Sequence, residues 1–200
     1  FVGYTEPAVR TRVSGAIADL DDQGNPTGRV ALALDETPFY TESGGQVSDV
    51  GRVQGEGFLL EVVDLVKQDG VVVHLAEMVE WSNPHPLKSL SAEEANAALL
   101  LQVFNKPVVA QIDLARRFDI MRNHTATHLL HAALRDVLGK HVAQAGSLVA
   151  PEHLRFDFAH GKPVSPEELA RIEATVNAQV LANLPVVIHA DLPLAEAKAR

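Results

Sequence analysis

The sequence predicts an α+β protein, in which a small N-terminal β-barrel-like domain precedes an α/β domain whose long, histidine-bearing helix packs on an antiparallel sheet. Two observations predict this class. Up to about residue 80 the chain consists of short β-branched stretches between turn residues, whereas from residue 114 it shows long helical patterns beside two short strands. We therefore expect a barrel-like domain with a glycine-rich motif at 1–81, a connector or insertion with one strand at 82–113, and the α/β domain at 114–200.

Four strands are expected in the first range. They are rich in β-branched residues, bounded by turn signals, and cover residues 13–20, 29–35, 58–66 and 71–75. The plainest turn signals are Asp22-Gln23-Gly24-Asn25-Pro26 and Gln68-Asp69-Gly70. Strands at this spacing favour a small barrel or closed sheet. The glycine-rich stretch around Ser43-Gly44-Gly45-Gln46 indicates tight turns or close backbone approach, and we interpret it as a barrel turn rather than a phosphate cradle.

The middle range begins with a connector at residues 82–90 and continues with a helix at 91–104. Ser91 is the expected N-cap of this helix, because Glu93 and Glu94 lie in its first turn. A strand is expected at 107–112. Residues 114–138 then predict one or two helices, which end at Gly139.

The last range continues with a strand pair at 141–149 and 154–158. The next helix starts with Ser165 as N-cap and Pro166 at the first helical position, and it is expected to run to about Asn183. Residues 186–190 predict another strand, and residues 193–200 predict the start of a helix.

The composition excludes several classes of protein. Hydrophobic residues make up 46% and charged residues 22% of the 200, as in ordinary globular proteins. No uninterrupted apolar stretch approaches the roughly 20 residues that a membrane helix needs, and no export leader is present at the N-terminus. Because there is no cysteine, the chain can form neither a disulfide nor a thiolate metal site. We expect a cytoplasmic protein that does not enter the membrane.

The net charge of −9 argues against a protein that binds nucleic acid through its overall charge. The charge is uneven, however, since residues 1–113 hold 17 acidic and 7 basic side chains and residues 114–200 hold 9 and 10. Contact with a polyanion should therefore fall on the second part. The candidate side chains are Arg116, Arg117, Arg122, Arg135, Lys140 and Arg155. The alternative is that these arginines are ordinary solvated surface.

Three histidines, His124, His128 and His131, follow one another at i, i+4 and i+7, which places them on one face of a helix. Two imidazoles one turn apart are a bidentate platform for zinc. The alternative is that they are partly exposed helix residues with no metal. A zincin protease is disfavoured, because Thr125 stands where that motif needs a glutamate.

The sequence around these histidines resembles the editing region of alanyl-tRNA synthetases. The similar stretches are 122–135, which contains His124-Thr125-Ala126-Thr127-His128, then 144–149 and 154–158. Residues 37–46 through 51 resemble the glycine-rich stretch of that family, and Phe1-Val2-Gly3-Tyr4 resembles the segment that joins its tRNA-binding helices to the editing region. The editing regions of threonyl-tRNA synthetases and the free-standing alanyl editing proteins are similar too.

The resemblance implies that the parent protein attaches alanine to tRNA-Ala with ATP, and that this region hydrolyses mischarged seryl or glycyl esters of tRNA-Ala. It implies zinc ligation by His124 and His128, with the other two ligands in a later C-x-x-x-H motif. Thr127 and Gln144 match polar residues of the editing pocket, where they are expected to be catalytic. Arg122, Arg135 and Arg155 are the expected contacts to the tRNA substrate.

The chain also departs from the family pattern. It ends at Arg200, before the C-x-x-x-H motif, and it lacks the ATP- and magnesium-binding aminoacylation domain and the dimerisation region. We therefore expect an incomplete zinc site and an inactive or impaired fragment. Two other functions stay open: a non-catalytic module that binds the tRNA acceptor stem, and a free-standing trans-editing protein.

Overall fold

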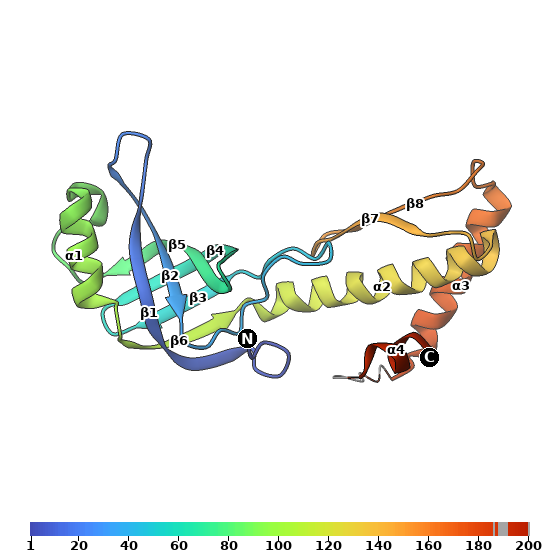
Figure 1. The fold of residues 1–200 in the computed structure, drawn as a ribbon, viewed down its shortest axis with the longest axis horizontal. Coiled ribbons are helices and arrows are strands. Elements are labelled where there is room, and N and C mark those ends of the chain that lie inside the picture. The colour runs from blue at the N-terminus through green and yellow to red at the C-terminus, as the bar shows by residue number, and fades with distance from the viewer. Residues whose placement is uncertain (186, 188–191, 200) are drawn as a thin grey trace. The chain divides into compact units, whose positions relative to one another are not determined.

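The computed structural model describes residues 1–185, 187 and 192–199 (Figure 1). The chain forms two compact units. The first comprises Phe1–Thr127 with Gln144–Asp157, and the second comprises His128–Ala143 with Phe158–Arg200. The division between them falls inside one helix, between Thr127 and His128. Within the described residues, no helix combines the length and the apolar composition needed to cross a membrane.

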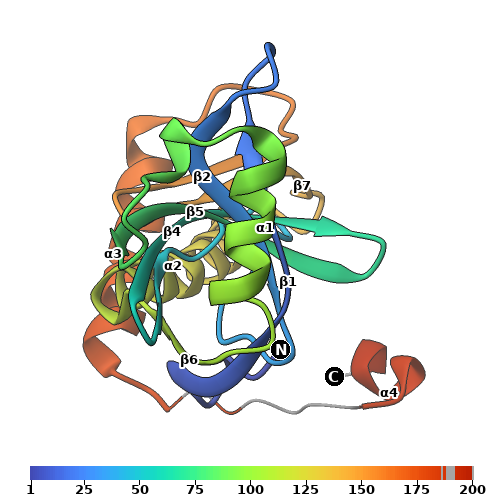
Figure 2. The same cartoon turned by 90° about the vertical axis from the view of Figure 1, so that its left-hand side faces the viewer.

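The first unit is built on a closed barrel of six antiparallel strands (Figures 1 and 2). The strands are β1 (Ala8–Leu20), β2 (Pro26–Leu34), β3 (Gly51–Gly55), β4 (Phe58–Gln68), β5 (Val71–Trp81) and β6 (Pro107–Ile112). Their order around the barrel is β1-β2-β5-β4-β3-β6, and β6 closes it by pairing with both β1 and β3. Closure leaves no open sheet edge on which another chain could pair.

The barrel core follows from the two-residue period of its strands. In β6 every second residue is buried, and these residues are Val108, Ala110 and Ile112. One end of the core is covered by α1 (Ala92–Gln102), which buries Ala95 and Leu99 in the same cluster, and by the short 3-10 helix η1 (Leu87–Ser89) (Figure 2). Ser91 caps α1, as the sequence predicts, and forms a capping box with Glu94.

A long single helix, α2 (Leu114–Leu138), leaves the barrel directly after β6. Asp113 starts it, because its carboxylate accepts a hydrogen bond from the Arg116 amide at 3.0 Å and its carbonyl accepts one from the Arg117 amide. Gly139, with a φ of 118°, follows its last turn. The predicted strand pair is present as β7 (Gln144–Val149) and β8 (Leu154–Phe158), which form a two-stranded sheet.

The second unit contains α3 (Pro166–Ala182) and α4 (Leu194–Ala199). Ser165 caps α3 in a capping box with Glu168, and Asn183 ends the helix in the left-handed conformation with a φ of 46°. Both ends agree with the prediction. Of the strand predicted at 186–190, the structure describes residue 187 alone, and the other four positions lie outside the described residues.

The α+β class and the four barrel strands predicted from the sequence are confirmed. One strand, β3, is not predicted, because it starts and ends on the glycines Gly51 and Gly55 and so looks like part of the glycine-rich loop. The strand predicted at 107–112 is present as β6, but it closes the barrel, whereas the sequence grouped it with the connector at 82–113. The boundaries at 81 and 113 stay a prediction.

A histidine lies inside the barrel. His74, on β5, is fully buried between Thr37, whose hydroxyl is 2.8 Å from Nε2, and the Leu32 carbonyl, 3.1 Å from Nδ1. Because a carbonyl can only accept, Nδ1 donates to Leu32 and Nε2 accepts from Thr37. Burial lowers the pKa of His74 from 6.5 to about 4, although the Leu32 hydrogen bond acts in the opposite direction. The ring is therefore neutral and fully hydrogen-bonded.

Candidate functional site

The predicted metal ligands lie in the middle of α2. His124 and His128 are one turn apart in a helix that is continuous from Leu114 to Leu138, so the spacing seen in the sequence is kept. Among the described residues, no group of three or more His, Cys, Asp or Glu side chains is arranged to hold a metal ion. These two histidines could therefore supply at most part of a zinc site.

His124 is held by a glutamine that sequence reasoning did not single out. The Nδ1 atom of His124 lies 2.7 Å from Oε1 of Gln46, and the Gln46 side chain belongs to a buried residue with a 7% exposed fraction. Since an amide oxygen has no proton to give, Nδ1 must be the donor. In the neutral form of this tautomer the lone pair lies on Nε2, which is the arrangement of a metal-bound histidine with an oriented second nitrogen. His124 therefore fits the role of zinc ligand.

Gln46 is placed by the glycine-rich loop. Ser43 and Gln46 close a tight turn through two backbone hydrogen bonds, of 3.2 and 3.0 Å. The turn docks on the end of β7, where the Val149 amide donates to the Gly45 carbonyl at 2.7 Å and the Val47 amide donates to the Val149 carbonyl at 3.1 Å. The stretch is thus a structural turn, as predicted, but it docks on β7 and carries a side chain to α2.

We expect Gly45→Ala to destabilise the first unit by about 1–2 kcal/mol, more than Gly44→Ala does. Both glycines have a positive φ, of 85° and 60°. A Cβ at Gly45 would lie 2.5 Å from the Ser147 carbonyl oxygen, whereas a Cβ at Gly44 would meet nothing within 4 Å. Urea unfolding of the two variants measures both losses of stability. Gly44→Ala reports the cost of the positive φ alone, and Gly45→Ala adds the cost of the close contact with Ser147. Equal losses would show that the contact with Ser147 is unimportant.

The predicted catalytic residues have the following surroundings. The Thr127 hydroxyl, in a buried residue, donates to the Asn123 carbonyl at 2.8 Å, so it bonds back to its own helix and only its acceptor capacity is left for a substrate. Gln144, on β7, donates from Nε2 to the Ser147 hydroxyl at 2.9 Å, and Ser147 Oγ lies 3.5 Å from the Gly44 carbonyl. Gln144 is therefore connected to the glycine-rich loop. The catalytic roles of both residues stay predictions.

The arginines predicted to contact tRNA all have intramolecular partners. Arg122 pairs with Asp119, and Arg155 donates to Asp157 at 3.1 Å, both as exposed pairs. In the second unit Arg135 donates to the Val142 carbonyl at 3.0 Å. Exposed pairs of this kind contribute little to stability and are easily exchanged for another anion.

The prediction that Arg117 contacts a polyanion is wrong. Its guanidinium is buried in an ion pair with Asp49, so Arg117 stabilises the fold.

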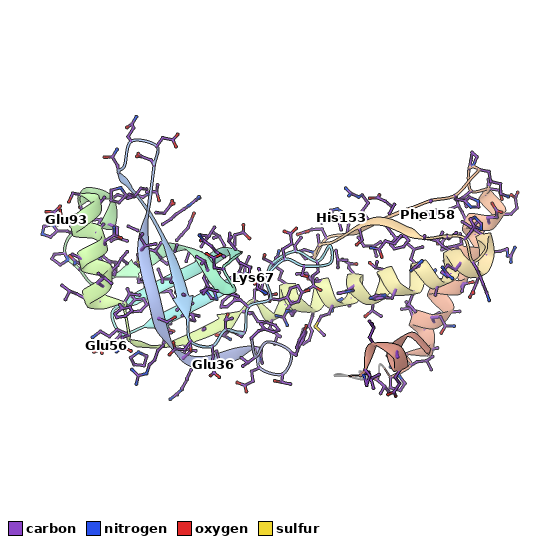
Figure 3. All side chains as sticks on the ribbon, in the orientation of Figure 1. Glu36, Glu56, Lys67, Glu93, His153 and Phe158 are labelled. Carbon is purple, nitrogen blue, oxygen red and sulfur yellow. The ribbon has the colours of Figure 1, made fainter. Side chains whose placement is uncertain are left out.

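The acidic residues counted in the first part of the chain are largely exposed. Glu36, Glu56 and Glu93 all lie on the surface of the first unit (Figure 3). The negative charge there argues against binding of nucleic acid by the barrel surface.

Sequence reasoning missed Asn123 as well as Gln46. The Asn123 side chain donates to the carbonyls of Ala150 and Pro151, at 2.7 and 3.1 Å, and so ties the turn between β7 and β8 to α2. For Gln46, the available signal was a polar residue directly after two glycines, which indicates a loop that aims a side chain. For Asn123 there was no signal beyond its place next to His124.

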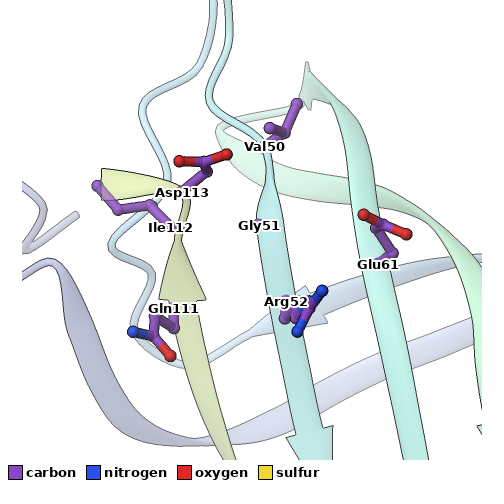
Figure 4. Close-up of a pocket in the computed structure, with 7 residues that line it drawn as sticks. All are labelled: Val50, Gly51, Arg52, Glu61, Gln111, Ile112 and Asp113. Atoms are coloured by element: carbon purple, nitrogen blue, oxygen red, sulfur yellow. The ribbon is translucent and has the colours of Figure 1, made fainter. Parts of the chain in front are cut away.

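A pocket of about 280 Å³ lies elsewhere on the barrel (Figure 4). It is formed where β3, β4 and β6 meet, and its lining residues are Val50, Gly51, Arg52, Glu61, Gln111, Ile112 and Asp113. Arg52 and Glu61 are cross-strand partners in it. None of the predicted site residues lines this pocket, so it is separate from the residues on α2.

Comparison with known proteins gives a consistent result. Residues 1–84 match the family described as tRNA synthetases class II (A). The chain is 49% identical to the alanine–tRNA ligase of Roseiflexus sp. (strain RS-1) over 160 residues, which are 80% of the chain and 16% of that protein. It is 44% identical to the alanine–tRNA ligase of Chlorobaculum tepidum over 204 residues, which cover 100% of the chain and 21% of that protein.

A third relative, the alanine–tRNA ligase of Acetivibrio thermocellus, is 42% identical over 192 residues, which are 94% of the chain and 20% of that protein. The chain thus spans about a fifth of the length of the curated relatives that it matches. The match covers the barrel, the glycine-rich loop and the histidine-bearing helix together. The chain is therefore a fragment of the alanine–tRNA ligase type, about a fifth as long as these relatives, and its residues 1–84 match the class II (A) tRNA synthetase family.

Proposed function

We propose that this region hydrolyses seryl and glycyl esters of tRNA-Ala, within a full-length protein that attaches alanine to tRNA-Ala. The observation that supports this most is the arrangement on α2, where Gln46 orients the imidazole of His124 and Thr127 lies between the two histidines in sequence. A hydrogen-bonded imidazole and a buried hydroxyl on one helix are groups with which a hydrolytic site can position its substrate.

The chemistry explains why such a site is needed. Serine differs from alanine by one hydroxyl, and an apolar aminoacylation pocket rejects such an analogue by only about a hundredfold. A second site that hydrogen-bonds the hydroxyl selects in the opposite direction. Thr127 can accept a hydrogen bond from the serine hydroxyl, because its own proton is directed to the Asn123 carbonyl. Gln144 has a carboxamide that can both donate and accept.

His124 and His128 are the residues that would hold zinc. When bound, zinc would polarise a carbonyl or lower the pKa of a water molecule. Four ligands complete such a site, and the chain has no cysteine, so the other ligands would come from elsewhere in the full-length protein. ATP and magnesium would belong to the aminoacylation domain of that protein. The tRNA would contact Arg122, Arg135 and Arg155, by exchange of their present partners for phosphate.

The test uses the full-length ligase that contains this region. We expect His124→Ala combined with Thr127→Ala to slow deacylation of Ser-tRNA-Ala by about 10²-fold or more, since the double variant loses both the ligand and the discriminating hydroxyl. Aminoacylation with alanine should not change. His153→Ala is the matched control, because His153 is an exposed histidine near the same sheet (Figure 3).

Deacylation at the wild-type rate by the double variant would contradict the editing assignment. If tRNA binding were then lost after substitution of Arg122, Arg135 and Arg155, the region would instead be a binding module for the acceptor stem. The readouts are therefore the rate of ester hydrolysis and the tRNA dissociation constant, measured at one stated salt concentration.

A further inference from the structure

We infer that Gln46 is the positioning residue for His124: its amide oxygen holds the proton of the imidazole on Nδ1 and so directs the Nε2 lone pair to a metal ion. This inference rests on the proposed function, because it concerns the same histidine. It assigns a role to the glycine-rich loop, which is otherwise a structural turn. Gln46 is not a metal ligand in this inference, and it acts only through His124.

The contact itself is specific. The 2.7 Å separation of His124 Nδ1 and Gln46 Oε1 is short for a hydrogen bond between neutral groups, and it joins residues 78 positions apart. Gln46 is one of few polar residues buried in the part of the chain that the structure describes. A buried amide oxygen that lost this donor would incur a desolvation cost, so the contact is favoured over alternative rotamers of either side chain.

The loop that carries Gln46 is hydrogen-bonded on both sides of this residue. On one side the Gly45 carbonyl and the Val47 amide are hydrogen-bonded to Val149. On the other side, the Glu42 amide donates to the Ser48 hydroxyl at 3.1 Å, and the Asp49 amide donates to the Tyr40 carbonyl at 3.0 Å. A side chain carried on such a braced turn loses little entropy when it orients a neighbour.

The absence of a side chain at Gly45 makes this bracing possible. A Cβ there would lie 2.5 Å from the carbonyl oxygen of Ser147, so only glycine allows the loop to approach β7 this closely. Gly45 and Gln46 therefore act together. Gly45 allows the loop to lie close to β7, and Gln46, carried on the same loop, contacts His124.

The experiment compares two substitutions in the full-length ligase, with zinc itself as the probe. Gln46→Met keeps the length of the side chain but removes the acceptor, whereas Gln46→Glu keeps an acceptor oxygen in the same place. We expect Gln46→Met to weaken zinc binding by about 10- to 100-fold, as loss of a partner of a metal-bound histidine typically does. Gln46→Glu should bind zinc at least as tightly as the wild type, since a carboxylate raises the basicity of the ring. Competition with a chromophoric chelator gives the dissociation constants.

If Gln46 had a purely structural role, Gln46→Met would melt at a lower temperature than the wild type without zinc, and its zinc dissociation constant would be unchanged. Thermal melting of the zinc-free proteins tests this alternative, and that result would overturn the inference. Weakened zinc binding in Gln46→Glu would overturn it as well, even if Gln46→Met did not fold. If the wild-type ligase bound zinc and deacylated Ser-tRNA-Ala while Gln46→Met kept full affinity, only this inference would fail. A wild-type ligase with neither property would overturn the proposed function and the inference together.

Discussion

Replacement of Arg117 by methionine is expected to destabilise the first unit by about 3–5 kcal/mol, because it leaves Asp49 as a buried carboxylate without its cation. The residues of this pair are only 8% and 1% exposed. Arg117 Nε donates to one oxygen of Asp49 at 2.9 Å, and Nη2 donates to the other. Its remaining donors reach the carbonyls of Gly3, at 2.8 Å, and Pro38, at 3.3 Å. The variant therefore removes four hydrogen bonds and one charge, although Oδ2 of Asp49 keeps the hydrogen bond from the Tyr40 amide, at 2.7 Å.

Urea unfolding monitored by circular dichroism measures this loss, with Arg122→Met as the matched control. Arg122 also pairs with an aspartate, but on the surface, where a salt bridge contributes about 0–1 kcal/mol. The combination of Arg117→Met with Asp49→Leu should be less destabilising than the sum of its parts, since no charge is then left buried. If Arg117→Met lost less free energy of unfolding than Arg122→Met, the Arg117–Asp49 pair would not stabilise the junction of barrel and helix.

Lowering the pH from 7 to 4 is expected to remove roughly 3 kcal/mol of stability through His74 alone. The pKa of His74 is about 4 in the folded protein, whereas an exposed histidine has a pKa of 6.5, because burial disfavours the charged ring. Between these values the unfolded chain binds more protons than the folded one, so stability rises with pH. The contribution is complete above pH 6.5 and is lost as the pH falls toward 4.

The measurement is urea unfolding at several pH values for the wild type and for His74→Gln, which cannot titrate. Stability at low pH also depends on exposed carboxyl groups, such as Glu94 and Glu168, whose pKa is lowered by hydrogen bonds in the helix caps. These groups act equally in both proteins. The difference between the two curves therefore isolates His74. Parallel curves from pH 7 to 4 would contradict a neutral, buried imidazole in the barrel.

Much of the barrel could be predicted from the sequence. Stretches rich in β-branched residues between turn signals marked four strands, and the N-cap serines Ser91 and Ser165 marked the starts of α1 and α3. β3 was not found, because this five-residue strand has glycine at both ends and a single β-branched residue, Val53. Closure was not predictable in detail, since β6 pairs with strands that lie far from it in the chain.

For the candidate site, the sequence by itself determined what is local. The spacing of His124 and His128 on one helix face depends only on helix geometry, and the structure keeps it. Only the tertiary structure decided that Gln46 accepts from His124 and that Arg117 is buried against Asp49 rather than exposed to tRNA. The physical reason is the same in both cases. These contacts join residues 78 and 68 positions apart, and a side chain carries no sequence signal of which distant partner folding will bring to it.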